Sequence, residues 1–489
     1  MNAEANDELY LGIDLGTSEI KAVLLSVHGG VVASAGQPLA LSRPQPGWSE
    51  QDPQAWWQAC CACVDRLTAN GAGARVRGIG LSGQMHGAVL LDARQRLLRS
   101  AMLWNDVRSA AECVELRESR ADYEELAGNL AMPGFTAPKL LWLRHHEPQL
   151  WERVAQVLLP KDYLRLQLTG VVATDASDAS GTLWLNIAQR DWSDPLLAAG
   201  GMRREQLPPV LEGSAPAGTL RGDLAQRWGM SADVVVAAGA GDNAAGAVGI
   251  GAVAPGQGFV SLGTSGVVFV VTDRHRPHPA SATHAFCHAI PGTWHQMSVM
   301  LSAASCLRWV SRLCGQRDEA GALQRAAALD ATQRARAPLF LPYLGGERTP
   351  HNDALARAMF HGLDHEHDAA ALIWSVLEGV AFGLRDGLQA MDASVRAWVQ
   401  ELDVVGGGAR SALWAQLIAD VLEVPLCLRT GNTAGAAVGA ARLGWLAAGG
   451  TIDALPTGGA SQRIEPKREH RDTLLQRYTR YRSLYPATR

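Results

Sequence analysis

Short apolar runs and glycine-containing turns alternate over the first fifty residues of the chain. The runs LYLGID, IKAVLLSV and VVASAGQPL are separated by GTS and HGG, a pattern that predicts three antiparallel strands joined by tight turns. From Asp52 to Leu67 the apolar spacing becomes helical, with Asp52 as a capping residue and Pro53 in the first turn. The opening segment therefore predicts strands followed by a helix.

The same arrangement of residues returns in the second half of the chain. The LGTS at Leu15 occurs again at Leu262, 247 residues later, between two further apolar runs. The segment DNAAGAVGIGA from Asp242 resembles GNTAGAAVGAA from Gly431, and each is a glycine-rich entry into an alanine-rich helix. We predict two similarly built α/β domains, residues 1–248 and 249–489, with a ligand cleft between them.

Composition narrows the class of protein. Of 489 residues, 47% are hydrophobic and 19% are charged, which excludes a disordered chain. The formal net charge of -4 gives no strong attraction to nucleic acid or an anionic membrane, so the expected partner is a small molecule. The N-terminus lacks the cationic start and apolar stretch of a secretory signal. The apolar stretch from Val234 carries Asp242 and Asn243 at its centre, which favours a buried strand and helix over a membrane span.

The cysteines indicate a reducing compartment. The eight cysteines form no CxxC pair and are too sparse for a disulfide framework, so we expect reduced thiols and a cytoplasmic protein. His284, Cys287 and His288 in THAFCHAI have the residue types of a zinc site. In a strand these side chains would diverge, and no second group of ligands lies nearby in the sequence. We therefore assign the three residues to the protein core.

Asp14 lies at the end of the first apolar run, immediately before Gly16, Thr17 and Ser18. Glycine lets backbone N–H groups approach a ligand, and the two hydroxyls are further donors for phosphate oxygens. A carboxylate in such a loop is compatible with phosphate when Mg²⁺ lies between them, and Lys21 adds a positive charge. Considered alone, the loop fits an ordinary turn capped by Asp better than a phosphate site.

A second loop, from Ser261 to Ser265, has the same glycine and hydroxyls but no acid. Two such loops facing each other across a cleft would hold the phosphate chain of a nucleotide from both sides. The GxxxxGK[ST] motif is absent, which excludes a P-loop enzyme. The GxGxxG motif is absent after the first strand, which disfavours a dehydrogenase.

Asp242 follows the β-branched run VVVAAGAG at the start of a predicted helix. The helix dipole stabilises an anion there, so Asp242 fits a structural cap. Gly239, Gly241 and Gly246 remove bulk around it, which a cap alone does not require. An open carboxylate can take a proton from a hydroxyl that attacks phosphorus. On these residues alone, a cap and a catalytic base are equally good interpretations.

Three further motifs follow or flank predicted strands. GGGAR at Gly406 has more glycines than a strand-to-helix turn needs and would form a flat surface for an adenine or ribose. GQMHG places Met85 and His86 between glycines, at a strand end where α/β proteins bind ligands. WNDVR at Trp104 joins an aromatic ring to amide, acid and guanidinium groups, a combination that suits a sugar. Packing of Trp104 in the core is the alternative.

Ten motifs, taken in order, resemble those of one known family. They are LGIDLGTS, PGWSEQDP, GQMHG, WNDVR, MPGFTAPKLLW, LLPKDYLRLQLTG, GAGDNAAGAVG, SLGTSG, FLPYLGGERTPHND and GGGAR. They extend over essentially the whole chain, which resembles the FGGY carbohydrate kinases. GFTAPKLLWLRHH and the stretch from Gly362 to Glu378 resemble the two signature segments of that family. The resemblance implies two ribonuclease-H-like domains of the actin and sugar-kinase superfamily around a central cleft, with sugar-binding elements in the first domain and nucleotide-binding elements in the second.

The resemblance also implies a reaction, the transfer of a phosphoryl group from ATP, with Mg²⁺, to the C5 hydroxyl of D-xylulose. Asp242 would be the base and Asp14 would hold Mg²⁺. The sugar site would comprise Met85, His86, Trp104, Asp106 and Asn243, and the nucleotide site Thr17, Ser18, Lys21, Thr264, Gly407, Gly408, Ala409 and Asn432. Glu19 departs from the small residue often found after DLGTS, and we expect it to face solvent.

Two alternatives to this reaction stay open. One is a kinase for another sugar or polyol, such as ribulose, glycerol or gluconate, because a single shifted hydroxyl contact can exchange the substrate. The other is an actin-like ATPase without a sugar acceptor, although GQMHG and WNDVR suit a polyol pocket. The resemblance is also compatible with a homodimer.

Overall fold

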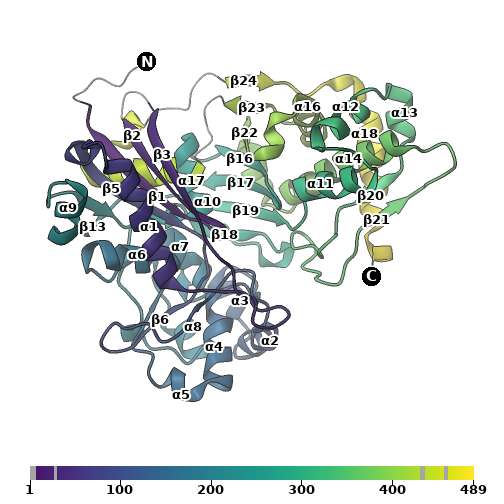
Figure 1. Cartoon of the computed structure of the whole chain (residues 1–489). Coiled ribbons are helices and arrows are strands. Elements are labelled where there is room, and N and C mark those ends of the chain that lie inside the picture. Colours follow the sequence, from purple (N-terminus) through teal and green to yellow (C-terminus); the bar gives the residue numbers. More distant parts are fainter. Residues whose placement is uncertain (1–6, 27–29, 430–434, 456–460, 489) are drawn as a thin grey trace.

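Two seven-stranded sheets, one in each half of the chain, organise the computed structural model (Figure 1). The structure describes residues 7–26, 30–429, 435–455 and 461–488. The first sheet contains β1 (Leu9–Leu15), β2 (Glu19–Ser26), β3 (Gly30–Pro38), β5 (Val76–Gly83), β13 (Pro216–Thr219), β14 (Val235–Ala237) and β15 (Ala240–Gly241). The second contains β16 (Gly258–Leu262), β17 (Gly266–Thr272), β18 (His284–Cys287), β19 (Trp294–Met300), β22 (Leu402–Val405), β23 (Leu426–Arg429) and β24 (Ser461–Ile464).

The two sheets share one strand order. In the first, β3, β2 and β1 are antiparallel neighbours, β5 and β14 continue parallel to β1, and β13 is antiparallel at the edge. In the second, β19, β17 and β16, then β22 and β23, then β24 repeat these directions, and β18 adds an edge strand. The two LGTS turns join β1 to β2 and β16 to β17. The predicted pair of ribonuclease-H-like sheets is therefore confirmed.

The first helix, α1 (Pro53–Thr68), forms as its sequence predicts. Asp52 is its N-cap and accepts a hydrogen bond from the Gln54 amide at 2.9 Å, while Pro53 occupies the first turn. Trp56 and Val64 lie on its buried side, which packs against β2 and β3. This helix covers one face of the first sheet.

Helix α17 (Gly435–Ala447), from the far end of the sequence, packs against β1 and β5 of the first sheet and against α10 (Asp242–Ile250) (Figure 1). Small residues make this contact possible. A Cβ atom at Gly80 would lie 1.7 Å from the carbonyl oxygen of Ala440, and one at Gly439 would lie 1.7 Å from that of Ala245. The predicted division at residues 248 and 249 falls inside α10, and this domain boundary stays a prediction.

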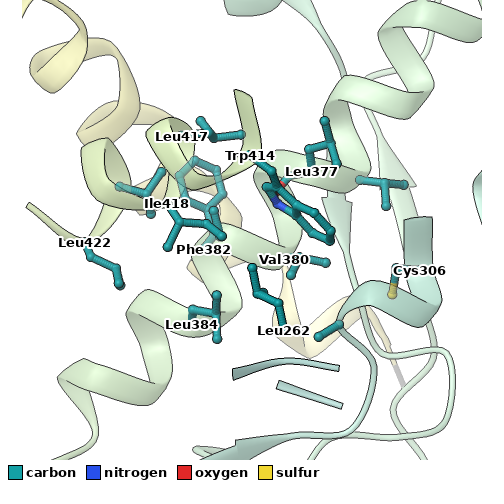
Figure 2. Close-up of a cluster of buried hydrophobic side chains, with 14 of the residues drawn as sticks. Leu262, Cys306, Leu377, Val380, Phe382, Leu384, Trp414, Leu417, Ile418 and Leu422 are labelled. Carbon is teal, nitrogen blue, oxygen red and sulfur yellow. The ribbon is translucent and has the colours of Figure 1, made fainter. Parts of the chain in front are cut away.

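The largest cluster of buried residues in the second half lies between its sheet and the helices that follow it (Figure 2). Trp414 is fully buried there and donates a hydrogen bond from Nε1 to the Leu377 carbonyl at 3.1 Å. Leu262, at the end of β16, packs into the same cluster, so the core fixes the second LGTS turn. The remaining elements of this half are α11 (Ala304–Leu313), α12 (Glu319–Ala327), α13 (Ala331–Arg336), β20 (Leu339–Leu341), β21 (Met359–His361), α14 (Ala369–Gln389), α15 (Ala393–Trp398), α16 (Ala412–Leu422) and α18 (Arg471–Ser483).

A long segment lies between β5 and β13, and much of it forms a lobe below the first sheet in Figure 1. Its elements are β6 (Val89–Leu91), β7 (Ala101–Met102), α2 (Ala110–Glu118), α3 (Tyr123–Ala127), α4 (Thr136–His146), α5 (Pro148–Trp151), β8 (Gln156–Leu158), α6 (Pro160–Thr169), β9 (Thr174–Asp175), α7 (Ala176–Ala179), β10 (Leu185–Asn186), β11 (Asp191–Trp192), α8 (Asp194–Ala199) and β12 (Val210–Leu211); β4 (Glu50–Gln51) pairs with β7, and α9 (Gly222–Trp228) follows β13. In the described ranges, every helix is too short or too polar to cross a membrane.

Candidate functional site

Two cavities meet at the N-terminus of α10. The larger, called the groove here, has a volume of about 620 Å³ and is lined by Asp242, Asn243, Gly246, Ile250, Phe259, Ser261, Val404, Val405, Gly406, Gly407, Arg410, Leu428, Arg429, Gly435 and Ala436. The smaller, called the pocket, has a volume of about 220 Å³ and is lined by Met85, His86, Trp104, Met132, Gly134, Phe135, Asp242, Asn243, Ser261, Ser265, Val267, His284, Met297, Val299 and Arg348. Asp242, Asn243 and Ser261 line both, so ligands in the two cavities would meet there.

Asp242 is the first residue of α10, which has Gly241 as its N-cap. Its Oδ1 accepts hydrogen bonds from the backbone N–H and from Nδ2 of Asn243, at 2.8 and 2.9 Å. Burial and then the negative charge of Asp14 raise the pKa of Asp242 to about 7, against the hydrogen bonds from Asn243, which lower it. This carboxyl group can therefore both hold and release a proton near neutral pH.

Asp14 lies at the end of β1, beside Lys21 of β2 and Ser82 of β5 in the strand register. The Ser82 hydroxyl donates to Asp14 Oδ1 at 2.9 Å. Burial raises the pKa of Asp14, the hydrogen bond from Ser82 and the charge of Lys21 lower it, and the charge of Glu19 raises it. Because the charge of Asp14 also acts on Asp242, the two acids are within electrostatic reach of each other.

His86 presents a neutral imidazole to the pocket. Its Nδ1 lies 2.7 Å from the Gly181 carbonyl oxygen, which can only accept, so Nδ1 carries the hydrogen. Burial and then the charges of Lys139 and Arg348 lower the pKa of His86 to about 3, against the hydrogen bond with Gly181, which raises it. The backbone carbonyl of His86 accepts from Lys139 Nζ at 2.9 Å. The ring is thus fixed with Nε2 as a hydrogen-bond acceptor.

Trp104 connects the pocket to the first LGTS turn. Its Nε1 donates to Thr17 Oγ1 at 2.9 Å, and Thr17 Oγ1 donates in turn to Gln84 Oε1 at 3.0 Å. A hydroxyl has one hydrogen, so Thr17 keeps no side-chain donor for a phosphate in this arrangement. Thr17 thus holds the position of the turn relative to the pocket.

Of the residues predicted for a sugar site, the structure brings four together in the pocket: Met85, His86, Trp104 and Asn243. Asp106 does not line the pocket, so the structure does not agree with its predicted contact with a sugar. It is 0% exposed and accepts from Arg108 Nε at 2.9 Å, from Arg108 Nη2 at 2.6 Å and from the Ser49 amide at 2.7 Å. This ion pair and the Ser49 amide occupy both carboxylate oxygens and leave none free for a ligand.

The three glycines of GGGAR have different roles. A Cβ atom at Gly406 would lie 2.7 Å from the Leu262 carbonyl oxygen, and Gly406 has a φ of 93°. A Cβ atom at Gly408 would lie 2.8 Å from the Leu262 Cβ. Gly407 instead lines the groove, with no atom within 4 Å of its Cβ position in the described parts of the chain. Gly406 and Gly408 therefore allow close packing, and Gly407 offers an open backbone surface to a ligand.

The remaining predicted nucleotide contacts lie on turns or outside the described residues. Ser18 and Thr264 are exposed on the two LGTS turns, and neither lines the groove. Glu19 is exposed, as predicted. Ala409 belongs to the turn before α16, and Asn432 lies outside the residues that the structure describes.

The structure adds residues that the sequence patterns did not reveal. Ser261 lines both cavities, and its place one residue before LGTS, where Asp14 stands in the first repeat, was a usable signal. Arg348 lines the pocket from within FLPYLGGERTPHND, and Arg410 lines the groove. His284, Cys287 and His288 are buried, as predicted, but His284 also lines the pocket.

Comparison with known proteins places this site in a family. Residues 9–249 match the N-terminal domain of the FGGY family of carbohydrate kinases, and residues 258–448 match the C-terminal domain. The chain is 51% identical over 441 residues to a xylulose kinase of Escherichia coli (strain K12), covering 90% of each protein. It superposes on the "xyloylose kinase" structure of Brucella ovis with a TM-score of 0.94 and 48% identity, over 98% of this chain and 99% of that one. A gluconate kinase of Lactobacillus acidophilus shares the fold, with a TM-score of 0.91 and 24% identity over 98% of each chain. The chain therefore belongs to the FGGY family of carbohydrate kinases.

Proposed function

We propose that this chain transfers the γ-phosphoryl group of ATP to the C5 hydroxyl of D-xylulose, giving D-xylulose 5-phosphate and ADP. The observation that carries the proposal is the position of Asp242, which lines both the groove and the pocket. The names of the Escherichia coli and Brucella ovis relatives support the choice of acceptor. The groove has the volume of a nucleotide-sized site, for which about 300–1,000 Å³ is usual, and the smaller pocket suits a single sugar.

Asp242 acts as the general base in this proposal. Its carboxylate accepts the proton of the C5 hydroxyl while that oxygen forms a bond to the γ-phosphorus and the bond from phosphorus to the ADP oxygen breaks. Because Asn243 holds Oδ1 with two hydrogen bonds, Oδ2 is the oxygen left to face the hydroxyl. A pKa of about 7 makes this carboxylate a stronger base than an ordinary aspartate, and a substantial share of the molecules still carry it ionised at neutral pH.

The acids at the site fit a Mg²⁺ ion bound together with ATP. Asp14 and Asp242 are half-buried carboxylates whose charges repel, a donor set that a divalent cation suits. Mg²⁺ is usually held by one or two carboxylates, waters and substrate phosphates. Within the described ranges, no three His, Cys, Asp or Glu side chains form a group that could hold a metal. Asp14, fixed by Ser82, would hold the ion, which supplies positive charge to the phosphates when bound.

The groove would hold the nucleotide. Gly407 offers its open backbone to the base or ribose, and Arg410 adds a guanidinium to the lining. The phosphates would be met by Ser18 and Thr264 on the two LGTS turns and by Lys21 of β2. These contacts would form when the halves close around both substrates. Closure also excludes water, which would otherwise compete with the sugar for the phosphoryl group.

An acceptor panel tests the proposed function. ADP release would be measured with D-xylulose, D-ribulose, glycerol and gluconate, and without any acceptor, at fixed Mg-ATP. We expect D-xylulose to give the highest kcat/KM, and turnover without an acceptor to be far slower. A clear preference for another acceptor would overturn the choice of D-xylulose. Turnover that ignores every acceptor would favour an ATPase without a sugar substrate.

A further inference from the structure

Arg348 is a cation of the pocket that lacks a partner of its own. It lies between β20 and β21, so the second half of the chain contributes it to the pocket wall. Within the described ranges, its guanidinium makes no hydrogen bond and no ion pair, and the charge of the adjacent Glu347 is the one that acts on it. A guanidinium withdrawn from water costs free energy unless acceptors meet its fork of N–H groups. The pocket therefore contains donors that a ligand can satisfy.

The neighbouring acid does not occupy these donors. Glu347 is 2% exposed, and its Oε1 accepts from the backbone N–H groups of Leu301 and Arg348, at 2.9 and 2.8 Å. Burial raises the pKa of Glu347 to about 8, so at neutral pH this group is mostly uncharged. Glu347 thus holds the backbone beside Arg348 and leaves the guanidinium free to face the pocket.

His284 supplies a second unsatisfied polar group at the same place. It is 2% exposed, stacks on Phe286 with ring centroids 5.3 Å apart, and its Nε2 has no hydrogen-bond partner in the described part of the chain. Phe135 lies between His284 and His86, with ring centroids 5.5 and 4.6 Å away. Burial is the largest cause that lowers the pKa of both histidines, and the charge of Arg348 lowers it as well. Arg348, His284 and His86 therefore lie near one another in the wall of the pocket.

The proposed reaction sets the orientation of the acceptor in the pocket. In the proposed reaction the C5 hydroxyl lies against Asp242, so the C1 and C2 end of the acceptor extends away from that carboxylate. We infer that Arg348 donates hydrogen bonds to the C2 carbonyl oxygen while His284 Nε2 binds the C1 hydroxyl, and that this pair selects 2-ketoses over the corresponding polyols. This inference rests on the proposed function, because it takes its orientation from the site of phosphorylation.

The preference for a 2-ketose over a polyol follows from the hydrogen-bond donors and acceptors that each group offers. A carbonyl oxygen presents two lone pairs and no hydrogen, which suits a guanidinium that has only donors. A hydroxyl at C2 brings a hydrogen that the guanidinium cannot accept and points its oxygen along a different direction. A site built to bond one polar group rejects an analogue that leaves it unsatisfied, because a buried donor is then unpaired.

The test compares D-xylulose with xylitol, in which the C2 carbonyl is reduced to a hydroxyl. We would measure kcat and KM for both acceptors in the wild-type enzyme and in Arg348→Met. We expect the ratio of kcat/KM for D-xylulose to that for xylitol to fall by about 10- to 100-fold in the variant, mainly through the KM of D-xylulose. The KM of ATP should stay within about 2-fold, because Arg348 does not line the groove.

Arg410→Met is the matched control, since it removes the same charge from the groove. It should raise the KM of ATP and leave the ratio of the two acceptors unchanged. An equal loss for D-xylulose and xylitol in Arg348→Met would overturn the inference and leave the proposed function intact. A wild-type enzyme that does not prefer D-xylulose over xylitol would instead overturn the proposed function itself.

A second variant keeps the inference testable if Arg348→Met does not fold. His284→Ala would be assayed with D-xylulose and with 1-deoxy-D-xylulose, which lacks the C1 hydroxyl. We expect the wild type to prefer D-xylulose by about 10-fold or more and the variant to lose most of that preference. Retention of the full preference by a folded His284→Ala would remove His284 from the inference.

Discussion

The ends of β1 and β16 occupy the same place in two sheets of one strand order, yet they carry different chemistry. Asp14 precedes the first LGTS and Ser261 precedes the second. Asp14 is a half-buried acid whose charge acts on Asp242, whereas Ser261 is a neutral hydroxyl that lines both cavities. A doubled fold thus supplies two equivalent strand ends, and only one of them needs a carboxylate. An acid at both would repel the phosphates from both sides.

The helices α10 and α17 show the same division. Both are rich in small residues and pack closely against each other, as Gly439 and Ala245 show. Asp242 begins α10, while the matching residue of the second repeat, Gly431, lies outside the described residues. The proposed base, Asp242, therefore stands on a helix through which the two halves touch, so a movement of the halves would also move it relative to the groove.

Asp242→Asn is expected to have the largest effect. It removes the carboxylate on which the charge of Asp14 acts, and this carboxylate is the proposed base. We expect kcat to fall about a thousandfold to ten-thousandfold, with the affinities for ATP and D-xylulose within about 3-fold of the wild type. Steady-state rates and isothermal titration would measure the two quantities. A near-normal kcat would remove Asp242 as the base. Weak binding of both substrates would indicate that the residue is mainly structural.

Substitutions at the two matched strand ends test the comparison directly. Asp14→Asn should lower kcat/KM by about 100- to 1,000-fold and raise the Mg²⁺ concentration needed for half-maximal rate, because the carboxylate that would hold the ion is lost. Ser261→Ala, at the same position of the other sheet, should cost about 10-fold or less, since it removes one neutral hydroxyl. Rates at several Mg²⁺ concentrations give both results. Equal losses in the two variants would contradict the division of roles.

Local patterns predicted much of this fold. The apolar runs and glycine turns located β1, β2 and β3, and Asp52 with Pro53 marked the start of α1. The LGTS repeat predicted two similar sheets, because strand pairing next to a turn is encoded by nearby residues. Asp242 could also be identified from nearby residues, because it is an acid at the start of a glycine-rich helix.

The remaining features of the fold and the site depend on contacts between segments far apart in the sequence, and local patterns do not predict these contacts. WNDVR gives no sign that Asp106 is taken by Arg108 and by the Ser49 amide, because Ser49 is 57 residues away in sequence. The apolar neighbours of His284 predict a core residue, and burial agrees, but only the meeting of both halves places it in the pocket. The packing of α17 on the first sheet likewise depends on contacts between distant segments.

Asp106→Ala tests a third acid in the first half of the chain, one that lines neither the groove nor the pocket. Its effect can be compared with those of Asp14 and Asp242. Its carboxylate and Arg108 are both almost fully buried, so removing it leaves a guanidinium partly uncompensated. We expect a loss of about 3 kcal/mol in the free energy of unfolding, measured by urea titration. The KM of D-xylulose in the folded variant should stay within about 3-fold. A large rise in that KM with unchanged stability would return Asp106 to the sugar site.

The smallest expected effect is on the pH dependence of the free energy of unfolding. It arises from the burial of Asp242 and from its repulsion by Asp14, and Ser261 has no such charge. Burial and Asp14 raise the pKa of Asp242 from 3.8 to about 7, so folding favours its protonated form. The wild type should therefore lose stability as pH rises from about 4 to 7 through this group, and the loss is complete above 7. Asp242→Asn cannot ionise, so it should be about 2 kcal/mol more stable than the wild type at pH 8 and nearly equal at pH 4.5. Ser261→Ala, the control from the neutral half, should follow the wild type at both pH values. Unfolding by urea at each pH measures the difference, and a gain in Asp242→Asn that does not change with pH would show that the carboxylate is not held in its neutral form.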